Sequence, residues 1–391
     1  MPRPLSSPSL RLLLPALAAL LGCQGGPARG PNDPIVLGVA WPWQARQGLR
    51  FEDGLTLAIE ETNAAGGVLG RPLSLRRVDD EESVDAGRLA AQALAADPEV
   101  TAVIGHLQSY VAVPAAAIYD LAGKVLLAPA ATDPRLTALG YPRVFRATFT
   151  DRVVGETLAS YARAQGYRRI AICYIRNTYG RNLANAFEED AIAHGLQIVA
   201  RQSYDPSDQV SERTFSEMVA DWRHEPLDAV FLAGETPSAG HFLVEARRQG
   251  LQVPVLGGDA LSSPELLQVA GADAEGVVVA TIFHPDDPRP EVRRFSDAFR
   301  RRFGIAPDPG AAIGYDAVRL LADAMTRAGS VDPAPLATAL HATRDFTGVT
   351  GTFTFGPDGD LIGKAPVIVQ VRQGEFAFRG APTPGAQMAA R

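Results

Sequence analysis

Cysteine and lysine are scarce in this sequence of 391 residues, which contains two of each. Cys23 follows an N-terminal apolar segment, so Cys173 is the only thiol left for the rest of the chain, and an intramolecular disulfide is excluded there. Cys173 lies in the apolar strand pattern 169–175, where we expect a small buried hydrophobe. Two lysines, Lys124 and Lys364, leave almost no candidates for amine-based covalent chemistry.

Motifs for catalysis and for metal or phosphate binding are also absent. The sequence has no G-x-S-x-G elbow, Walker-type loop, H-E-x-x-H or C-x-x-C, and its six histidines are scattered. Residues 358–360 (DGD) lack the spacing of a calcium loop and favour a polar turn. A net charge of −7 argues against a nucleic-acid partner. We therefore expect no catalytic residue, cofactor or metal, and an enzyme stays a remote alternative.

The N-terminus has the plan of an export signal rather than of a membrane span. Arg3 and Arg11 precede an apolar run at 12–21 that is too short to cross a bilayer. Residues 20–23 (LLGC) resemble the bacterial lipobox, in which the cysteine becomes the lipid-modified first residue. We predict a signal peptide at 1–22, lipidation at Cys23 and a flexible tether over 23–34, which would hold a periplasmic or cell-surface protein on a membrane. The alternative is an ordinary cleaved signal with an incidental cysteine.

What the chain has in quantity is an alternation of apolar strand and amphipathic helix patterns. A hydrophobic fraction of 46% and a charged fraction of 21% describe a globular protein, long enough for two domains. The alternation runs from residue 35 to about 148 and begins again at 151, with the same plan but a different sequence. It predicts an α/β fold of two similar lobes. Strands are expected at 35–40, 73–78, 101–105, 125–127, 168–175, 196–203, 228–232, 253–256 and 276–280.

The stretch 101–132 forms one such unit and ends in polar residues. Ser109 follows the first of its strands and Thr132 follows the second. Because parallel strands open a crevice beyond their carboxyl ends, we expect Ser109 and Thr132 to line one.

The C-terminal third departs from this alternation. Helices are expected over 291–303, 311–328 and 332–342, and the residues alone do not assign them to a lobe. Residues 351–355 and 367–371 are expected to form a final hairpin, followed by a disordered tail over 381–391.

Several short motifs, in order along the chain, resemble the type I periplasmic binding proteins of the leucine/isoleucine/valine class. They are residues 63–70 (NAAGGVLG), 79–80 (DD), 105–106 (GH) with Ser109, 128–132 (APAAT) through Thr137 and 140–141 (GY), 145–146 (FR), 179–180 (YG), 257–259 (GGD) and 274–276 (AEG). Each motif alone is weak, but their order and spacing over 35–378 are specific.

The resemblance implies two doubly wound βα lobes, joined by three hinge crossings, with a ligand cleft between them. The crossings would fall near 149–151, 281–284 and 346–349. Lobe 1 would then comprise 35–149 and 284–346, which places the late helices, and lobe 2 would comprise 150–283 and 347–380. Closure of such lobes is a hinge motion driven by ligand contacts made in the closed state.

The resemblance also implies a ligand site for an amino acid. Ser109 and Thr132 would bind its carboxylate, Ala130 would offer a carbonyl, Tyr179 would reach from the second lobe, and Asp259 would pair with the ammonium group. Each has a plainer alternative, since Ser109 or Asp259 would also suit a helix cap and Thr132 would suit a turn.

Three departures from the family affect the choice of ligand. Trp41 and Trp43 stand in a short first loop, where they would form a stacking wall or fill a gap in the rim. Glu235 stands where the family often has aromatic residues. It would act as a second acidic contact, which would favour a cationic or polyfunctional ligand, or it would be a solvated surface residue. Asp259 is one methylene shorter than the glutamate of branched-chain binders.

We therefore expect an extracytoplasmic solute-binding lipoprotein of an ABC-type uptake system. It would bind an amino acid or a related small amide or carboxylate, and its partners would be a permease, an ATPase and, through the anchor, a membrane. A ligand-sensing domain of the same fold is the alternative.

Overall fold

The computed structural model describes residues 33–206 and 208–380, so the predicted signal peptide, Cys23 and the tail over 381–391 lie outside the described residues. Within those two ranges, none of the helices is long and apolar enough to cross a membrane.

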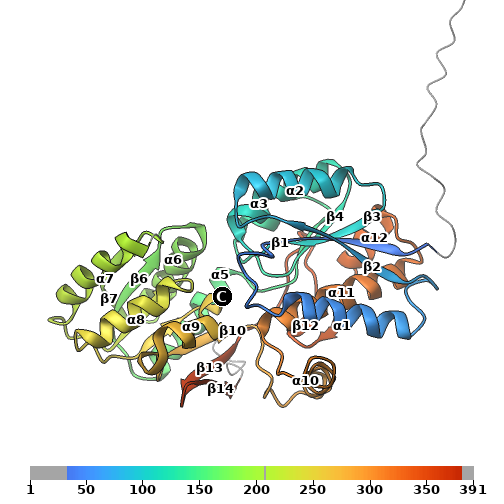
Figure 1. Ribbon diagram of the computed structural model, residues 1–391. Helices are drawn as coiled ribbons and strands as arrows, with labels where there is room; N and C mark the ends of the chain where they lie inside the picture. Colours follow the sequence, from blue (N-terminus) through green and yellow to red (C-terminus); the bar gives the residue numbers. More distant parts are fainter. Residues whose placement is uncertain (1–32, 207, 381–391) are drawn as a thin grey trace, which may run out of the picture. The chain divides into compact units, whose positions relative to one another are not determined.

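The first lobe is built on a parallel five-stranded sheet with the order β2-β1-β3-β4-β5. Strand β3 is buried along its whole length because helices cover both faces of the sheet, with α2 and α3 on one side and α1 and α11 on the other (Figure 1). The strands are β1 (Ile35–Trp41), β2 (Leu73–Asp79), β3 (Val100–Gly105), β4 (Val125–Ala128) and β5 (Val144–Arg146). The helices that alternate with them are α1 (Phe51–Ala64), α2 (Val84–Ala96), α3 (Ser109–Leu121) and α4 (Arg135–Ala138).

The second lobe repeats this winding in a seven-stranded sheet with the order β14-β13-β10-β9-β8-β6-β7. Strands β6 to β10 are parallel, and β13 and β14 add an antiparallel edge. The elements are β6 (Arg169–Ile175), β7 (Gln197–Tyr204), β8 (Ala229–Ala233), β9 (Val255–Gly257), β10 (Val278–Thr281), β13 (Val367–Arg372), β14 (Glu375–Gly380), α5 (Asp151–Ala164), α6 (Thr178–Ala193), α7 (Asp208–Trp222), α8 (Ser238–Arg248), η1 (Asp259–Leu261), α9 (Pro264–Ala270) and η2 (Gly271–Ala274).

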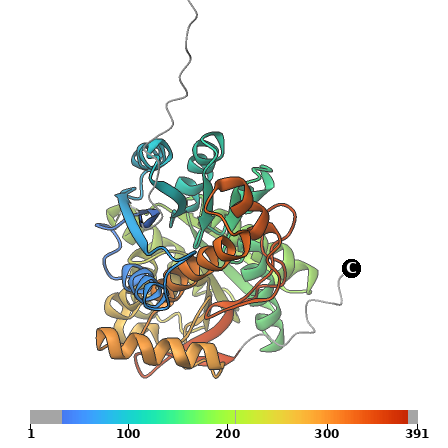
Figure 2. The ribbon, with the colours of Figure 1, turned by 90° about the vertical axis from the view of Figure 1, so that its right-hand side faces the viewer.

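The three late helices return to the first lobe. They are α10 (Pro290–Phe303), α11 (Pro309–Ala328) and α12 (Pro333–His341). Figures 1 and 2 both place α11 alongside α1, and this approach depends on Gly54, where a Cβ would overlap the carbonyl oxygen of Ala311. Helix α10 also contacts α1, and α12 contacts α11.

Two predictions for the C-terminal segment are wrong. The residues expected to form one final hairpin belong to two, because β12 (Gly351–Phe353) pairs with β11 (Phe346–Gly348) while β13 pairs with β14. The chain also stays longer on the first lobe than the crossing expected near 346–349 allows. Arg146 donates its backbone N–H to the carbonyl oxygen of Gly359 and its Nε to Asp360, so residues up to about 361 pack on the first lobe. The third passage to the larger sheet lies between Leu361 and Val367.

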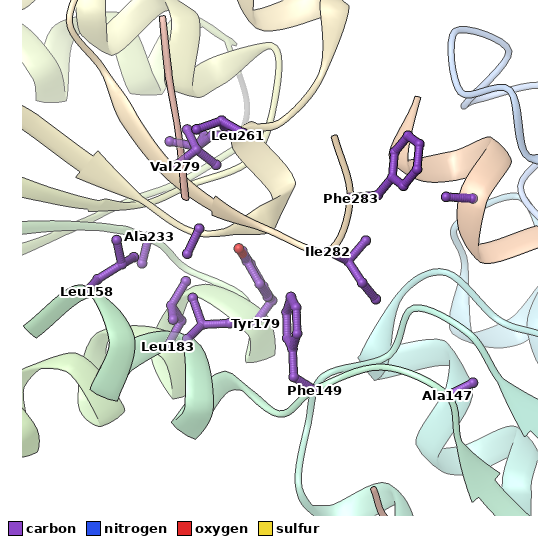
Figure 3. Packing of buried hydrophobic residues seen from close by; sticks show 14 of the residues in the cluster. Ala147, Phe149, Leu158, Tyr179, Leu183, Ala233, Leu261, Val279, Ile282 and Phe283 are labelled. Atoms are coloured by element: carbon purple, nitrogen blue, oxygen red, sulfur yellow. The ribbon is translucent and has the colours of Figure 1, made fainter. Parts of the chain in front are cut away.

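The buried apolar cluster continues through the passages between the lobes. Phe149 precedes α5, Ile282 and Phe283 follow β10, and all three belong to one cluster with Tyr179 of the second lobe (Figure 3). Cys173 is buried in the same cluster, as its strand pattern predicted.

Candidate functional site

A cavity of about 590 Å³ is lined by residues of both lobes at the carboxyl ends of their parallel strands. The two sheets share the same strand order, β2-β1-β3-β4-β5 in the first lobe and β7-β6-β8-β9-β10 in the second. The order of the strands reverses between β1 and β3 in the first lobe and between β6 and β8 in the second. Ligands bind at such reversals, because the loops on either side diverge there. Of the predicted ligand contacts, Ser109, Ala130, Thr132, Tyr179, Glu235 and Asp259 all line this cavity, which we call the cleft.

Ser109 and Thr132 lie side by side at the first-lobe wall of the cleft. Helix α3 begins at Ser109 and its N-cap residue is Gln108, so the Ser109 side chain is not the cap that the plainer alternative required. Its hydroxyl oxygen accepts a hydrogen bond from the backbone N–H of Asp133 at 3.3 Å, which ties the loop after β4 to the start of α3. Thr132 is buried, and its carbonyl oxygen accepts the backbone N–H of Asp151.

Tyr179 and Asp259 form the opposite wall as a hydrogen-bonded pair. The Tyr179 hydroxyl donates to Oδ1 of Asp259 at 3.1 Å and accepts the backbone N–H of Ala260 at 3.4 Å. Gly258 lets the two approach, because a Cβ there would lie 2.6 Å from the Tyr179 hydroxyl. Burial raises the pKa of Asp259 to about 6, although the Tyr179 hydrogen bond favours the charged form.

Glu235 and Arg46 meet where the lobes face each other at the other end of the cleft. Nη2 of Arg46 approaches Oε2 of Glu235 to 3.7 Å, and Nη1 donates to the carbonyl oxygen of Thr236 at 3.4 Å. Asn177 donates to Oε1 of Glu235 at 2.7 Å. The Glu235 side chain is 13% exposed and its pKa is raised by burial, so the solvated-surface alternative does not describe it.

Arg46 was missed by reasoning from the sequence. Its Nε lies 2.5 Å from Oε1 of Glu82, an oxygen that also accepts a hydrogen bond from Gln108 at 2.8 Å. A basic residue in the loop after the first strand and an acidic residue after the second were the available signal, because those two strands are neighbours in the sheet.

Both tryptophans lie away from the described residues that line the cleft. Trp41 is 1% exposed and stacks on Phe51 with ring centroids 3.7 Å apart. Trp43 donates its indole N–H to the carbonyl oxygen of Val78 at 3.0 Å and packs against the core. The expected stacking wall is therefore corrected to the other alternative, in which the two rings fill the rim.

Asp151 is a second residue that the sequence did not single out. It is 2% exposed at the first position of α5. Within the described residues neither of its carboxylate oxygens has a hydrogen-bond partner, although the Thr132 hydroxyl lies close enough to favour the charged form. Burial, with a contribution from Asp259, raises its pKa to about 8. A helix N-terminus favours a carboxylate by roughly 0.3–1 kcal/mol, which is less than the several kcal/mol that burying an ion costs.

The described residues contain no group of three or more histidine, cysteine, aspartate or glutamate side chains that could hold a metal ion. The polar groups of the cleft are hydroxyls, guanidiniums, amides, carboxylates and backbone groups, which suit a small charged organic molecule.

Comparison with known proteins adds to this geometry. Residues 42–375 match the sequence model of a family described as periplasmic binding protein. The chain is 30% identical over 351 residues to Leu/Ile/Val-binding protein homolog 2 of Brucella abortus, covering 87% of this chain and 91% of that protein.

Two solved structures extend the likeness to the fold. An ABC transporter substrate-binding protein of Desulfitobacterium hafniense, in complex with Leu, is 38% identical with a TM-score of 0.80, covering 89% of this chain and 100% of that one. The branched-chain amino acid transporter substrate-binding protein LivJ of Streptococcus pneumoniae, in complex with isoleucine, is 26% identical with a TM-score of 0.82. The match covers 89% of this chain and 99% of that one. The predicted resemblance and fold class are confirmed.

Proposed function

Because the chain belongs to the periplasmic binding protein family, whose members bind the substrates of transporters and are not enzymes, we propose that it binds a free amino acid in the cleft. The observation that carries the proposal is the pairing of opposite chemistries across one cavity. The hydroxyls of Ser109, at the start of α3, and of Thr132, after β4, lie on the first-lobe wall, and a buried carboxylate lies on the second-lobe wall.

The carboxylate of the amino acid would bind at Ser109 and Thr132. The first turn of α3 leaves backbone N–H groups without partners inside the helix, and the helix dipole favours a negative charge at that end. Helix α3 has 13 residues and no acidic residue in its first turn, so no side chain of its own opposes an anion there.

The ammonium group would bind at Asp259, with the carbonyl of Ala130 as a second acceptor. A charge-assisted hydrogen bond in a desolvated cleft contributes about 1.5–3 kcal/mol. The Tyr179 hydroxyl holds Oδ1 of Asp259 and so fixes the carboxylate toward the cleft wall.

Such a ligand would contact both lobes at once, and it would therefore favour the closed arrangement in which both sets of contacts form. The closed protein would present the amino acid to the permease of an ABC-type uptake system, with ATP hydrolysed by a separate subunit. Lipidation at Cys23, proposed from the LLGC sequence, would hold the chain at the membrane surface outside the cytoplasm.

A thermal-shift screen of the purified protein against the standard amino acids tests the proposal. A ligand present at 100 times its Kd and bound only by the folded state stabilises it by about 2.7 kcal/mol. We expect at least one amino acid to raise Tm, and we expect Thr132→Ala and Asp259→Asn each to abolish or reduce that rise. The variant Glu245→Gln, at a residue that does not line the cleft, should keep the rise in Tm. A rise with carboxylates lacking an ammonium group, unaffected by Asp259→Asn, would contradict the proposed site.

A further inference from the structure

The cleft holds more negative than positive side chains, and the excess gathers at the Arg46 end. Its lining includes the acidic residues Glu235, Asp259, Glu265 and Asp308 and the basic residues Arg46 and Arg50. Asp308 caps α11 by accepting the backbone N–H of Ala311 at 2.8 Å and also accepts that of Arg50, so it serves the helix end.

Arg46 alone faces three glutamates. Its electrostatic partners are Glu82, Glu235 and Glu265. Glu82 holds the guanidinium at 2.5 Å, whereas Glu235 is 3.7 Å away, beyond hydrogen-bond distance. One positive charge for three carboxylates leaves this end of the cleft short of cations.

The zwitterionic part of an amino acid does not change that balance. Its carboxylate and ammonium groups would be met by Ser109, Thr132 and Asp259, and together they bring no net charge. The side chain of the ligand is therefore the part that faces Glu235.

We propose that the preferred ligand is an amino acid whose side chain ends in a second cationic group, and that Glu235 binds this group. The inference rests on the proposed function and specifies its ligand. A branched aliphatic side chain would cover Glu235 with hydrocarbon and leave it only the partners it already has, Asn177 at 2.7 Å, Gln108 and the more distant Arg46, and burying a carboxylate is costly unless it is closely paired. A cation placed at Oε2 would give Glu235 the close partner that Arg46, held by Glu82, does not provide.

The structure has room for a longer side chain. A second cavity of about 560 Å³ shares Arg46, Glu235 and Thr236 with the cleft, and its other polar lining residues include Glu82, Tyr110, Asn177 and Arg181. Its walls carry the Glu82 and Glu235 carboxylates, the Asn177 amide oxygen and the Tyr110 hydroxyl oxygen as acceptors for a nitrogen cation, beside the guanidiniums of Arg46 and Arg181.

Isothermal titration calorimetry with L-lysine, L-ornithine, L-arginine, L-norleucine and L-leucine tests the inference. Norleucine is the informative control, because its side chain is that of lysine without the terminal ammonium group. We expect at least one basic amino acid to bind ten times or more tightly than norleucine and leucine. Glu235→Gln should weaken its binding at least tenfold and leave norleucine unchanged or tighter, and Glu245→Gln should change neither.

The remaining outcomes separate this inference from the proposed function. Leucine or norleucine binding as tightly as every basic amino acid would overturn the inference and leave the proposed function standing. If a folded Glu235→Gln protein binds lysine and norleucine more weakly by the same factor, Glu235 has a structural role and the inference is overturned. Binding of no amino acid at all would overturn both. If Glu235→Gln does not fold, the comparison of lysine with norleucine in the unaltered protein decides the question.

Discussion

At the scale of single residues, burial rather than sequence motif gives the cleft its chemistry. Aspartates are ordinary surface residues in most proteins, but Asp259 and Asp151 are desolvated here and their pKa values are raised to about 6 and about 8. After burial, the negative charge of Asp259 helps to raise the pKa of Asp151, and that of Glu235 helps to raise the pKa of Asp259, because negative charges in one desolvated region repel. A ligand ammonium group would relieve part of this repulsion, so binding and proton release are linked.

The first prediction follows from the pKa of Asp259. An ammonium group pairs with the carboxylate form, and a proton competes for the same oxygens as the pH falls below about 6. We expect affinity for the amino acid to decrease steadily from pH 7 to pH 5. Asp259→Asn should weaken binding at pH 7 roughly 10-fold to 100-fold, as expected for a loss of 1.5–3 kcal/mol.

Calorimetry at four pH values checks this, with Thr132→Ala as the matched control. Thr132→Ala removes a contact to the other end of the ligand, so it should weaken binding but keep the pH dependence. An unchanged pH dependence in Asp259→Asn would show that another group is responsible.

A second prediction concerns the stability of the protein and Asp151. The folded-state pKa of about 8 lies above that of an unfolded aspartate, so between about pH 4 and pH 8 the folded state binds more protons than the unfolded state. The free energy of unfolding therefore falls as the pH rises through this window. Asp151→Asn, which keeps the shape without the charge, should raise it by a few kcal/mol at pH 8.5, since each pKa unit corresponds to about 1.4 kcal/mol.

Urea denaturation at pH 5 and pH 8.5 measures the effect. Asp297→Asn, at an exposed position on α10, should leave the pH dependence as it is in the unaltered protein. Equal stabilisation by Asp151→Asn at both pH values would contradict the assignment of the raised pKa to this residue.

At the scale of elements, the late helices complete the first lobe by closing one face of its sheet. Helix α11 packs on α1 through small residues, with Gly54 against Ala311 and Gly314 against Phe51. Their apolar periodicity predicted these helices well, but their partner was set by contacts far apart in the sequence. Small residues at helix spacing are the only local sign of such close approach.

Gly54→Ala is the third prediction. Alanine favours a helix over glycine by about 1 kcal/mol, but the added Cβ would overlap the Ala311 carbonyl oxygen and force α11 away. We expect a net loss of about 1–3 kcal/mol in the free energy of unfolding, as for other overpacked sites. Gly48→Ala is the matched control, because a Cβ there meets nothing within 4 Å. Equal stabilities of the two variants in urea denaturation would show that the packing is looser than described.

At the scale of the whole molecule, the ligand site is divided between two separately wound sheets. The chain passes between them after β5, after β10 and between Leu361 and Val367, and the cleft residues lie on the loops on either side. Ligand contacts made from both lobes are therefore the link between binding and a change of conformation.

The fourth prediction is that ligand binding makes the protein more compact. Small-angle X-ray scattering should give a smaller radius of gyration with a saturating amino acid than without it. The double variant Thr132→Ala/Asp259→Asn should keep the ligand-free value at the same amino acid concentration. A bound amino acid, confirmed by calorimetry, without any change in the radius would argue against closure.

The sequence by itself determined the local elements, because their apolar periodicity and their capping or terminating residues are encoded within each segment. Examples are the fully buried strand 100–105 and the cap at Ser83, which accepts the backbone N–H of Ala86. Through family resemblance it also indicated five residues, and through a departure from the family Glu235, all of which the structure gathers in one cleft, since strand ends of parallel sheets meet at one edge.

Only the tertiary structure decided the features that depend on residues distant in the chain. The tryptophans pack away from the cleft because Trp41 stacks on Phe51 and Trp43 donates its indole N–H to the carbonyl oxygen of Val78. The final strands found different partners from those expected, because Arg146 holds residues 359–360 on the first lobe. Arg46 faces Glu235 from a position 189 residues earlier in the chain, since 235 − 46 = 189. Desolvation likewise has no signature in the sequence, so the raised pKa values of Asp259 and Asp151 follow only from the packing of the folded chain.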